Sequence, residues 1–265
     1  MTGDDHALAR DLAALAGERL LALRGLGGEQ DDLRKAGDRQ SHDFLTAELA
    51  ARRPGDVVLS EEGADNPARL GARRVWIVDP LDGTREFGEP GRADWAVHVA
   101  LWERSDTSDG GDLTAGAVAL PAQGQVVSTA EPPPPRSGTG DAAAEPGEAA
   151  GKIRIVVSRS RPPAFVRNIS GLIDAELVPL GSAGAKVAAV VNGEVDAYVH
   201  GGGFYEWDTA APVAVARAAG LHASRIDGSA LAYNQSDLLM PDILVCRPAL
   251  AGTLLRAIRE VTHAP

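Results

Sequence analysis

The sequence contains a single cysteine, Cys246, among its 265 residues. It therefore has no intrachain disulfide, and a metal site built from cysteines is excluded. It also lacks any run close to the roughly 18 consecutive apolar residues of a membrane-spanning helix. The first residues, Thr2-Gly3-Asp4-Asp5, are acidic where a secretion signal would be basic. From these absences we expect a soluble, cytoplasmic protein with no membrane partner.

Positive charge is scarce as well. The chain has 26 Lys and Arg residues against 37 Asp and Glu residues, which gives a formal net charge of −11. Such a balance argues against nucleic acid as a partner. It would also repel a phosphorylated small molecule, unless bound cations invert the local field. The hydrophobic fraction of 44% is ordinary for a globular protein and excludes general disorder.

The first half of the chain predicts a mixture of helices and strands. Leucines near helical spacing predict an amphipathic helix over 6–24, and a second helix is predicted over 43–53, before Pro54-Gly55. Short apolar runs between turn residues then predict a series of strands. These runs cover 57–59, 75–78, 95–101, 116–120 and 126–127. We interpret residues 1–130 as an α+β subdomain.

A change of composition separates the two halves. Residues 131–150 are rich in Pro, Gly and Ala and contain too little apolar surface to order themselves, so we expect a flexible loop there. After it, strands and helices are predicted in alternation, which is typical of an α/β arrangement. The strands are expected over 153–157, 176–180, 195–199 and 243–245, and the helices over 163–172, 183–191, 209–219 and 249–261. Residues 151–265 would form this α/β subdomain and complete the active site.

The most informative segment is Val75-Trp76-Ile77-Val78-Asp79-Pro80-Leu81-Asp82-Gly83-Thr84. A buried strand would deliver Asp79 at its carboxyl end, where α/β sheets usually place ligands. Pro80 ends the strand, and Gly83 permits a sharp turn that brings Asp82 beside Asp79. Two carboxylates, a hydroxyl and free backbone amides suit a hard cation such as Mg²⁺ that carries a phosphate. The alternative interpretation is a surface turn, since Asp, Pro and Gly are common turn residues.

Two further acidic elements add to this segment. Glu61 follows another apolar strand in Leu59-Ser60-Glu61-Glu62, and Asp208 lies at a helix start in Trp207-Asp208-Thr209. Taken alone, the first is compatible with a solvated surface pair and the second with a helix cap. Brought together with Asp79 and Asp82, these acids would repel one another strongly without metal. That repulsion leads us to expect more than one Mg²⁺.

These motifs, in this order, resemble the inositol monophosphatase superfamily of Mg²⁺-dependent, lithium-sensitive phosphatases. Within it, the chain is similar to the bacterial CysQ-type 3′(2′),5′-bisphosphate nucleotidases. That branch is indicated by Leu81, by Arg85-Glu86-Phe87, by Ser158-Arg159-Ser160 and by Gly181-Ser182 with Lys186. The resemblance implies an α/β fold in which helices and sheets form an αβαβα layered sandwich. It also implies two to three Mg²⁺ ions in each active site.

The resemblance assigns roles to individual residues. The implied metal ligands are the side chains of Glu61, Asp79, Asp82 and Asp208, together with the backbone carbonyl of Leu81. The implied catalytic residues are Asp43, Thr84 and Glu61, of which Asp43 and Thr84 would form the pair that orients the attacking water. Where family members usually have a Ser-Pro-Val-Thr-x-Ala-Asp approach to that aspartate, this chain has Gln40-Ser41-His42-Asp43. Asp43 is therefore also open to interpretation as an ordinary helix-cap aspartate.

Substrate contacts are expected from several segments. Arg159 could pair with the phosphate that is not cleaved, and Gly181-Ser182 with Lys186 could cradle a phosphate at a helix start. A helix cap or a solvated charge is the alternative for each. His98, inside an apolar strand, is interpreted as a hydrogen-bonded core histidine. The predicted substrate-binding set comprises Asp82, Gly83, Thr84, Ser158, Arg159, Ser160, Gly181, Ser182, Lys186 and Asp208.

Aromatic and histidine side chains just before Asp208 are candidates for the nucleoside. Tyr198, His200, Phe204 and Tyr205 could stack on adenine. Ordinary packing explains them equally well.

The resemblance implies a Mg²⁺-dependent phosphatase that removes the 3′-phosphate of 3′-phosphoadenosine 5′-phosphate. It would yield AMP and phosphate and recycle a by-product of sulfate assimilation. The 5′-phosphosulfate relative is a second candidate substrate. The same chemistry on inositol monophosphate or fructose 1,6-bisphosphate remains an alternative, as does a non-catalytic nucleotide or metal sensor. The expected partner is a small phosphorylated nucleotide, and the oligomeric state, a homodimer included, stays open.

Overall fold

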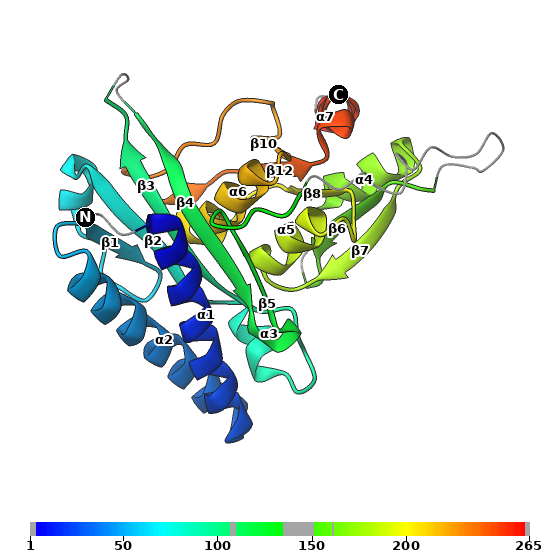
Figure 1. Cartoon of the computed structure of the whole chain (residues 1–265). Coiled ribbons are helices and arrows are strands. Elements are labelled where there is room, and N and C mark those ends of the chain that lie inside the picture. Colours follow the sequence, from blue (N-terminus) through cyan, green and yellow to red (C-terminus); the bar gives the residue numbers. More distant parts are fainter. Residues whose placement is uncertain (1–3, 107–109, 135–150, 161, 263–265) are drawn as a thin grey trace.

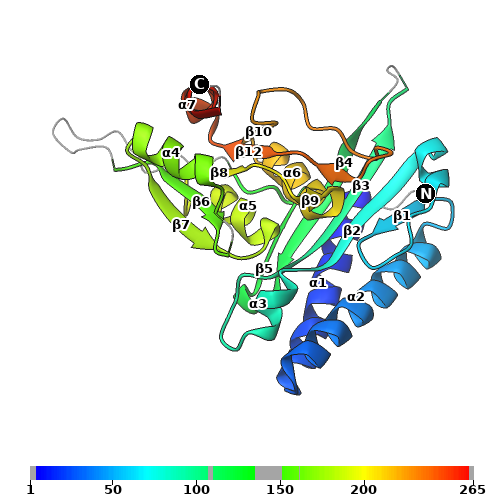
Figure 2. The same ribbon diagram turned by 180° about the vertical axis from the view of Figure 1, so that it is seen from behind.

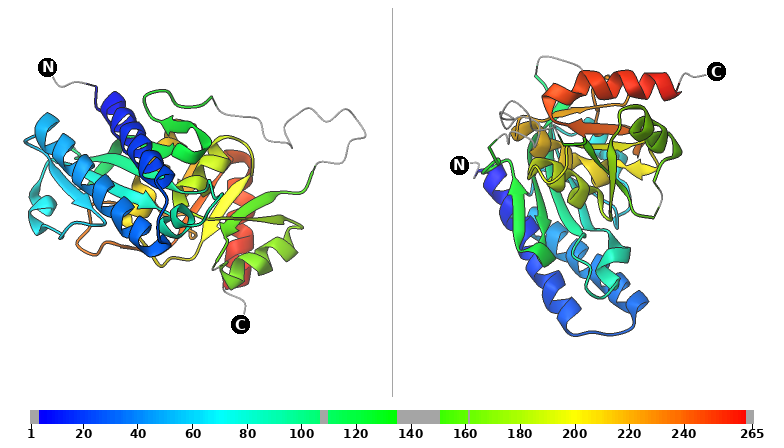
Figure 3. Two further views of the ribbon diagram at one scale, coloured as in Figure 1. Left: turned by 90° about the horizontal axis from the view of Figure 1, so that it is seen from below. Right: turned by 90° about the vertical axis from the view of Figure 1, so that its right-hand side faces the viewer.

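The computed structural model describes residues 4–106, 110–134, 151–160 and 162–262. These residues form five layers, in which helices cover both outer faces and fill the space between two sheets (Figure 1). Figure 3 shows α1 and α2 on one side of the molecule and α4 and α7 on the opposite side. The layered αβαβα arrangement expected from the resemblance is confirmed.

The first sheet carries the segment with Asp79 and Asp82. Its strand order is β1-β2-β3-β4-β5, with β1 parallel to β2 and the other pairs antiparallel. The bounds of these strands are Val57–Ser60 for β1, Arg74–Asp82 for β2, Ala96–Arg104 for β3, Gly111–Leu120 for β4 and Gln125–Ser128 for β5.

The second sheet packs against the two central helices on the side away from the first sheet (Figure 2). Its strand order is β10-β12-β8-β6-β7, and β9 and β11 form a separate two-stranded ribbon. The bounds are Arg154–Ser158 for β6, Glu176–Leu180 for β7, Ala197–His200 for β8, Phe204–Tyr205 for β9, His222–Ser224 for β10, Leu239–Met240 for β11 and Ile243–Cys246 for β12.

The helices follow the layers. Helices α1 and α2 cover the outer face of the first sheet, α5 and α6 lie between the sheets, and α4 and α7 cover the outer face of the second sheet. Their bounds are Asp5–Gly25 for α1, Gln30–Arg52 for α2, Ala164–Leu172 for α4, Ala183–Val191 for α5, Glu206–Ala218 for α6 and Pro248–Thr262 for α7. Three shorter helices are η1 (Pro67–Gly71), α3 (Thr84–Gly88) and η2 (Pro121–Gln123).

Alternation along β2 explains how one strand serves two hydrophobic layers. Val75 and Ile77 pack against α5 and α6, whereas Trp76 and Val78 pack against α1 and α2. All four side chains are fully buried. Because successive side chains of a strand point to opposite faces, a continuous apolar run is what a strand in the middle of such layers requires.

The start of the second helix differs from the prediction. The helix predicted over 43–53 runs from Gln30 to Arg52, so Asp43 lies in its middle. Residues 30–40 contain few apolar side chains, which hid the helical pattern. The helix nevertheless packs closely there, since a side chain at Gly37 would come within 2.9 Å of Leu81 and Phe87. A small residue lets the helix approach β2 and α3 at this point.

The remaining predicted helices and strands are confirmed, with ends that move by a few residues. Of the loop predicted over 131–150, residues 135–150 lie outside the described part of the chain. The division into subdomains on either side of it stays a prediction. Within the described ranges, no helix has both the length and the apolar character needed to cross a membrane.

Candidate active site

The end of β2 brings Asp79 and Asp82 to the same side of the sheet. Residues three apart on a regular strand face opposite sides, but the pairing with β3 shifts register between these two. Such an irregularity re-aims side chains. Oδ1 of Asp79 accepts the backbone N–H of Leu81 at 3.0 Å, which tightens the turn. Gly83 then adopts a left-handed conformation, with φ of 85°, and α3 begins.

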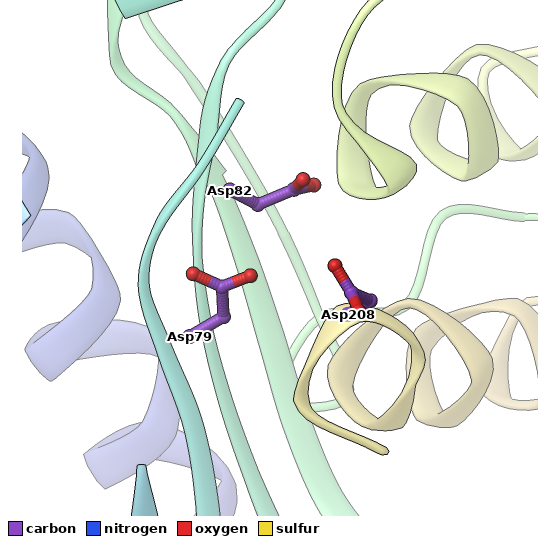
Figure 4. A group of neighbouring side chains, drawn as sticks. All are labelled: Asp79, Asp82 and Asp208. Atoms are coloured by element: carbon purple, nitrogen blue, oxygen red, sulfur yellow. The ribbon is translucent and has the colours of Figure 1, made fainter. Parts of the chain in front are cut away.

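A third aspartate approaches from α6. Asp208 lies in the first turn of that helix, and its Oδ2 accepts the backbone N–H of Tyr205 at 2.6 Å. Oxygen atoms of Asp79, Asp82 and Asp208 lie within 4.8 Å of one another. Figure 4 shows the three carboxylates turned towards a common space between β2 and α6. The structure therefore brings together three of the four acids that the sequence singled out.

Glu61 joins this group from the end of β1. Its backbone N–H reaches the carbonyl of Val78 at 3.4 Å, and its carboxyl group shares a hydrogen bond with Asp79. The residue as a whole is exposed, while its carboxyl group lies among the other acids. Glu61 therefore closes the solvent side of the cluster.

Electrostatics show that the cluster is short of positive charge. Burial raises the pKa of Asp79 well above its usual range, and the neighbouring carboxylates raise it further. For the same reasons the pKa of Glu61 rises to about 7 and the pKa of Asp208 to about 6. Buried acids that must ionise close together favour their protonated forms unless a cation compensates them.

Asp82 is the exception in this cluster. Burial acts to raise its pKa, but His98, Lys186 and Ser182 outweigh that effect and hold the pKa below its usual value. Oδ2 of Asp82 accepts the Ser182 hydroxyl at 2.5 Å and the backbone N–H of Gly184 at 2.7 Å. Asp82 is therefore fixed as a carboxylate at the start of α5, where a helix favours negative charge.

The donor set fits a hard divalent cation. Clustered carboxylate oxygens with a nearby backbone carbonyl are the ligands that Mg²⁺ and Ca²⁺ prefer. The raised pKa values of Asp79 and Glu61 indicate a site whose repulsion a cation would relieve. The carbonyl of Leu81 accepts the Thr84 hydroxyl at 3.0 Å, so it lies beside the catalytic candidates as well.

The pairing predicted between Thr84 and Asp43 is wrong. The Thr84 hydroxyl lies 3.2 Å from Oδ1 of Asp38, while Asp43 is exposed. The reason is helical geometry: positions 38 and 43 are five residues apart, so they project from different faces of α2. The face that meets β2 also includes Ser41, whose hydroxyl donates to the carbonyl of Pro80 at 2.7 Å. Burial raises the pKa of Asp38 to about 6.

A cavity of about 450 Å³ opens beside the aspartates. Its walls combine polar groups near Asp82 and Asp208 with aromatic rings farther out. The lining residues are Asp82, Ser158, Pro163, Phe165, Ser182, Ala183, Lys186, Tyr198, His200, Gly201, Gly202, Gly203, Phe204 and Asp208. Its volume lies within the roughly 300–1,000 Å³ of small-molecule sites. Of the four residues proposed to meet adenine, Tyr205 is missing from the lining, and its ring stacks on Trp207 instead.

The other predicted substrate contacts fall into two groups. Ser158, Ser182 and Lys186 line the cavity, although Nζ of Lys186 also donates to the backbone carbonyl of Ser182 at 2.6 Å. Arg159 is already engaged, because its guanidinium donates to Glu86 at 2.6 Å and to Glu89 at 3.1 Å.

The remaining predicted contacts lie close by. The backbone N–H of Gly181 donates to Asp94 at 2.6 Å. Gly83, Thr84 and Ser160 line a neighbouring hollow with Arg85 and Glu86.

Sequence reasoning missed the position of His98. Its Nε2 lies 3.2 Å from Oδ2 of Asp82, and its Nδ1 lies 3.1 Å from the carbonyl of Trp207, next to Asp208. The histidine is buried, as predicted, but it bridges the two elements that carry aspartates. The sequence carries no signal for this, because the position of His98 depends on the register of β2 and β3, in which His98 pairs with Asp79.

Comparison with known proteins provides relatives over most of the chain. The profile of the inositol monophosphatase family matches residues 7–263. A protein of Mycobacterium leprae named 3′-phosphoadenosine 5′-phosphate phosphatase is 52% identical, over 97% of this chain and 94% of its own. The 3′(2′),5′-bisphosphate nucleotidase CysQ of Escherichia coli is 32% identical, over 75% of this chain and 78% of its own.

A solved structure agrees with the fold. The crystal structure of inositol monophosphatase II from Staphylococcus aureus superposes with a TM-score of 0.77 at 21% identity. The match covers 97% of this chain and 96% of that one.

Proposed function

Since the chain belongs to the inositol monophosphatase family, we propose that it hydrolyses the 3′-phosphate of 3′-phosphoadenosine 5′-phosphate to AMP and phosphate. One observation carries this proposal: two of the three clustered aspartates, Asp82 and Asp208, line a cavity of about 450 Å³ that also has aromatic lining residues. The identity of 52% to a relative named for that substrate supports it.

The aspartate cluster would hold Mg²⁺. Asp79, Asp82 and Asp208, with Glu61 and the carbonyl of Leu81, supply the oxygen ligands. Bound Mg²⁺ supplies the positive charge that offsets these acids and polarises both the phosphate and the attacking water. A hydrophobic inner layer behind β2 holds the carboxylates in a fixed orientation.

Thr84 and Asp38 would orient the attacking water and accept its proton. The Thr84 hydroxyl lies within hydrogen-bond distance of both Asp38 and the Leu81 carbonyl, and its single proton serves one of them at a time. When it donates to Asp38, its oxygen can accept a hydrogen bond from water. Asp38, with a pKa of about 6, is ionised at neutral pH and can take up a proton through that hydroxyl. These two residues thus orient the water and accept its proton while the ester bond breaks.

The nucleoside would lie in the cavity, with the 3′-oxygen towards Asp208. Tyr198, His200, Phe204 and Phe165 line it, and the His200 ring lies 6.1 Å from that of Tyr198 and 4.9 Å from that of Phe204. Gly201 packs directly against the Phe165 ring, since a side chain there would come within 2.7 Å of it. Flat aromatic walls of this kind suit a purine base.

A substrate panel tests the proposal. Phosphate release is measured from 3′-phosphoadenosine 5′-phosphate, from inositol 1-phosphate and from fructose 1,6-bisphosphate, with Mg²⁺ titrated in each case. We expect the highest kcat/KM for the nucleotide and no release without a divalent cation. Equal kcat/KM for inositol phosphate would reject the nucleotidase assignment. Mg²⁺-dependent nucleotide binding without release from any substrate would identify a sensor instead.

A further inference from the structure

A buried arginine lies outside the cavity described above. Arg69, in η1, is 1% exposed, and its guanidinium contacts three partners. Nε donates to Asp65 at 2.7 Å, Nη1 to the side-chain oxygen of Asn234 at 2.8 Å, and Nη2 to the carbonyl of Gln235 at 2.8 Å. The side-chain amide of Asn234 returns a hydrogen bond to the carbonyl of Arg69 at 3.2 Å. The segment around residue 234 is thus fastened to η1.

The same segment is held from the other side by Glu206. This carboxylate is fully buried at the first position of α6 and accepts two backbone N–H groups. They come from Asn234 and Gln235, each at 2.7 Å. Asn234 has a φ of 58°, in the left-handed region, which asparagine adopts more readily than most non-glycine residues, and these contacts hold it there. Arg69 and Glu206 therefore both form hydrogen bonds with the same two consecutive residues, Asn234 and Gln235.

This chain of contacts joins two elements that carry proposed metal ligands. On one side, Asp65 and η1 end the loop that starts at Glu61. On the other side, Glu206 precedes Asp208 by two residues on α6. Figure 2 shows the segment after β10 arching from the second sheet towards the first. The network thus links a residue four positions after Glu61 to a residue two positions before Asp208, although Glu61 and Asp208 are 147 positions apart in the sequence.

A structural tie alone would not require a buried charge. Removing a guanidinium from water costs several kcal/mol. Apolar side chains of similar volume often stabilise a fold as much as a buried ion pair does. A forked cation that reaches three acceptors does, however, fix their relative positions. Metal sites need their oxygens held to within about 0.5 Å. The network could therefore hold in place the ligands that do not come from β2, namely Glu61 and Asp208.

We propose that Arg69 is a positioning residue for the metal site, which sets the separation of Glu61 and Asp208 through Asn234, Gln235 and Glu206. This inference rests on the proposed function, because it takes the acidic cluster to be a Mg²⁺ site. Arg69 touches neither substrate nor metal in this account. Its effect would be seen in Mg²⁺ affinity.

Two matched substitutions test the inference on the full chain. Arg69→Lys keeps the charge but loses the fork. Arg74→Lys does the same to an arginine that pairs with Asp5, Asp56 and Glu103 at the far end of β2. The Mg²⁺ Kd of the metal-free proteins is measured by isothermal titration calorimetry, and unfolding is followed by circular dichroism. We expect Arg69→Lys to weaken Mg²⁺ binding by up to about tenfold, the lower end of the loss seen when a direct partner of a ligand is removed, because Arg69 acts through intermediate residues. Arg74→Lys should lower the Tm without changing the Kd.

The kcat of Arg69→Lys distinguishes a positioning role of Arg69 from general damage to the fold. At saturating Mg²⁺, Arg69→Lys should recover most of the wild-type kcat, because the ligands themselves are intact. An unchanged Mg²⁺ Kd in folded Arg69→Lys would overturn the inference while leaving the proposed function in place. If that variant does not fold, Asp65→Asn, at a partly exposed partner, must show weaker Mg²⁺ binding in its stead. Wild-type protein that binds no Mg²⁺ would overturn both proposals.

Discussion

The hydroxyl of Thr84 lies 3.2 Å from Oδ1 of Asp38, across 46 residues of sequence. This pair replaces the one expected with Asp43 and leads to a matched experiment. Asp38→Asn should lower kcat by about 10²–10⁴, the usual contribution of a positioned proton acceptor. Asp43→Asn makes the same chemical change on the exposed face of α2 and should leave kcat unchanged. Steady-state phosphate release decides between them, and equal losses in both variants would restore Asp43 as a candidate.

Asp82→Asn tests the cluster itself. Loss of one ligand charge should abolish measurable turnover and weaken Mg²⁺ binding, since the remaining acids no longer offset the cation. The fold should persist, because an asparagine oxygen can still accept the N–H of Gly184. The helix start loses a favourable charge, worth about 0.3–1 kcal/mol, so the Tm should fall only slightly. Near-native turnover in a folded variant would remove Asp82 from the proposed ligands.

Binding of Mg²⁺ should release protons. In the absence of metal, the pKa of Glu61 is raised from 4.5 to about 7 and that of Asp208 from 3.8 to about 6. A raised carboxyl pKa means that the folded protein holds protons that a cation must displace. Affinity for Mg²⁺ should therefore increase as the pH rises from 6 to 8. Calorimetry in buffers of different ionisation enthalpy measures the protons released, and a pH-independent Kd without release would contradict this account.

The same shifts affect stability in the absence of metal. The folded state binds more protons than the unfolded chain between the ordinary and the raised pKa values of these acids. The free energy of unfolding should accordingly fall as the pH rises through about 4 to about 7 with a chelator present. Saturating Mg²⁺ should remove this contribution. Parallel urea titrations with EDTA and with Mg²⁺ would reveal the difference.

The Phe165 ring should contribute to nucleotide recognition. It is half-buried, lines the cavity and faces the glycine run. Stacking of a base on an aromatic ring is worth about 1–3 kcal/mol, so Phe165→Leu should raise the KM for the nucleotide about tenfold. Hydrolysis of inositol 1-phosphate, which has no base, serves as the internal control and should keep its KM. An equal rise in KM for both substrates would show that the ring supports the packing of the site and does not recognise the base.

Much of the fold could be predicted because its signals are local. The apolar run of β2, the turn residues after it and the helical leucines of α1 each follow from neighbouring residues, and the family profile confirms the superfamily that the motifs indicated. The start of α2 escaped prediction because its packing there depends on Gly37, which carries no hydrophobic signal. The partner of Thr84 was misassigned for the same reason, as the correct face of the helix could not be identified without its true start.

Contacts between distant segments were beyond the reach of the sequence. His98 was interpreted as a core residue, and it is buried, yet its position beside Asp82 depends on the register of β2 with β3. Arg69 drew no attention because lone arginines are usually exposed. Two of its three partners, Asn234 and Gln235, lie 165 and 166 residues away, in a segment with no regular pattern.

The order of strands in the second sheet has a consequence for how the protein is made. Its middle strand, β8, is flanked by β6 and by β12, which ends at Cys246, so the sheet that backs α6 stays unfinished until Cys246 has been added to the chain. A nascent chain already carries Asp79 and Asp82 long before Asp208 has its support. The proposed active site should therefore form only after β12 has been synthesised, and a chain terminated before β12 is expected to be inert.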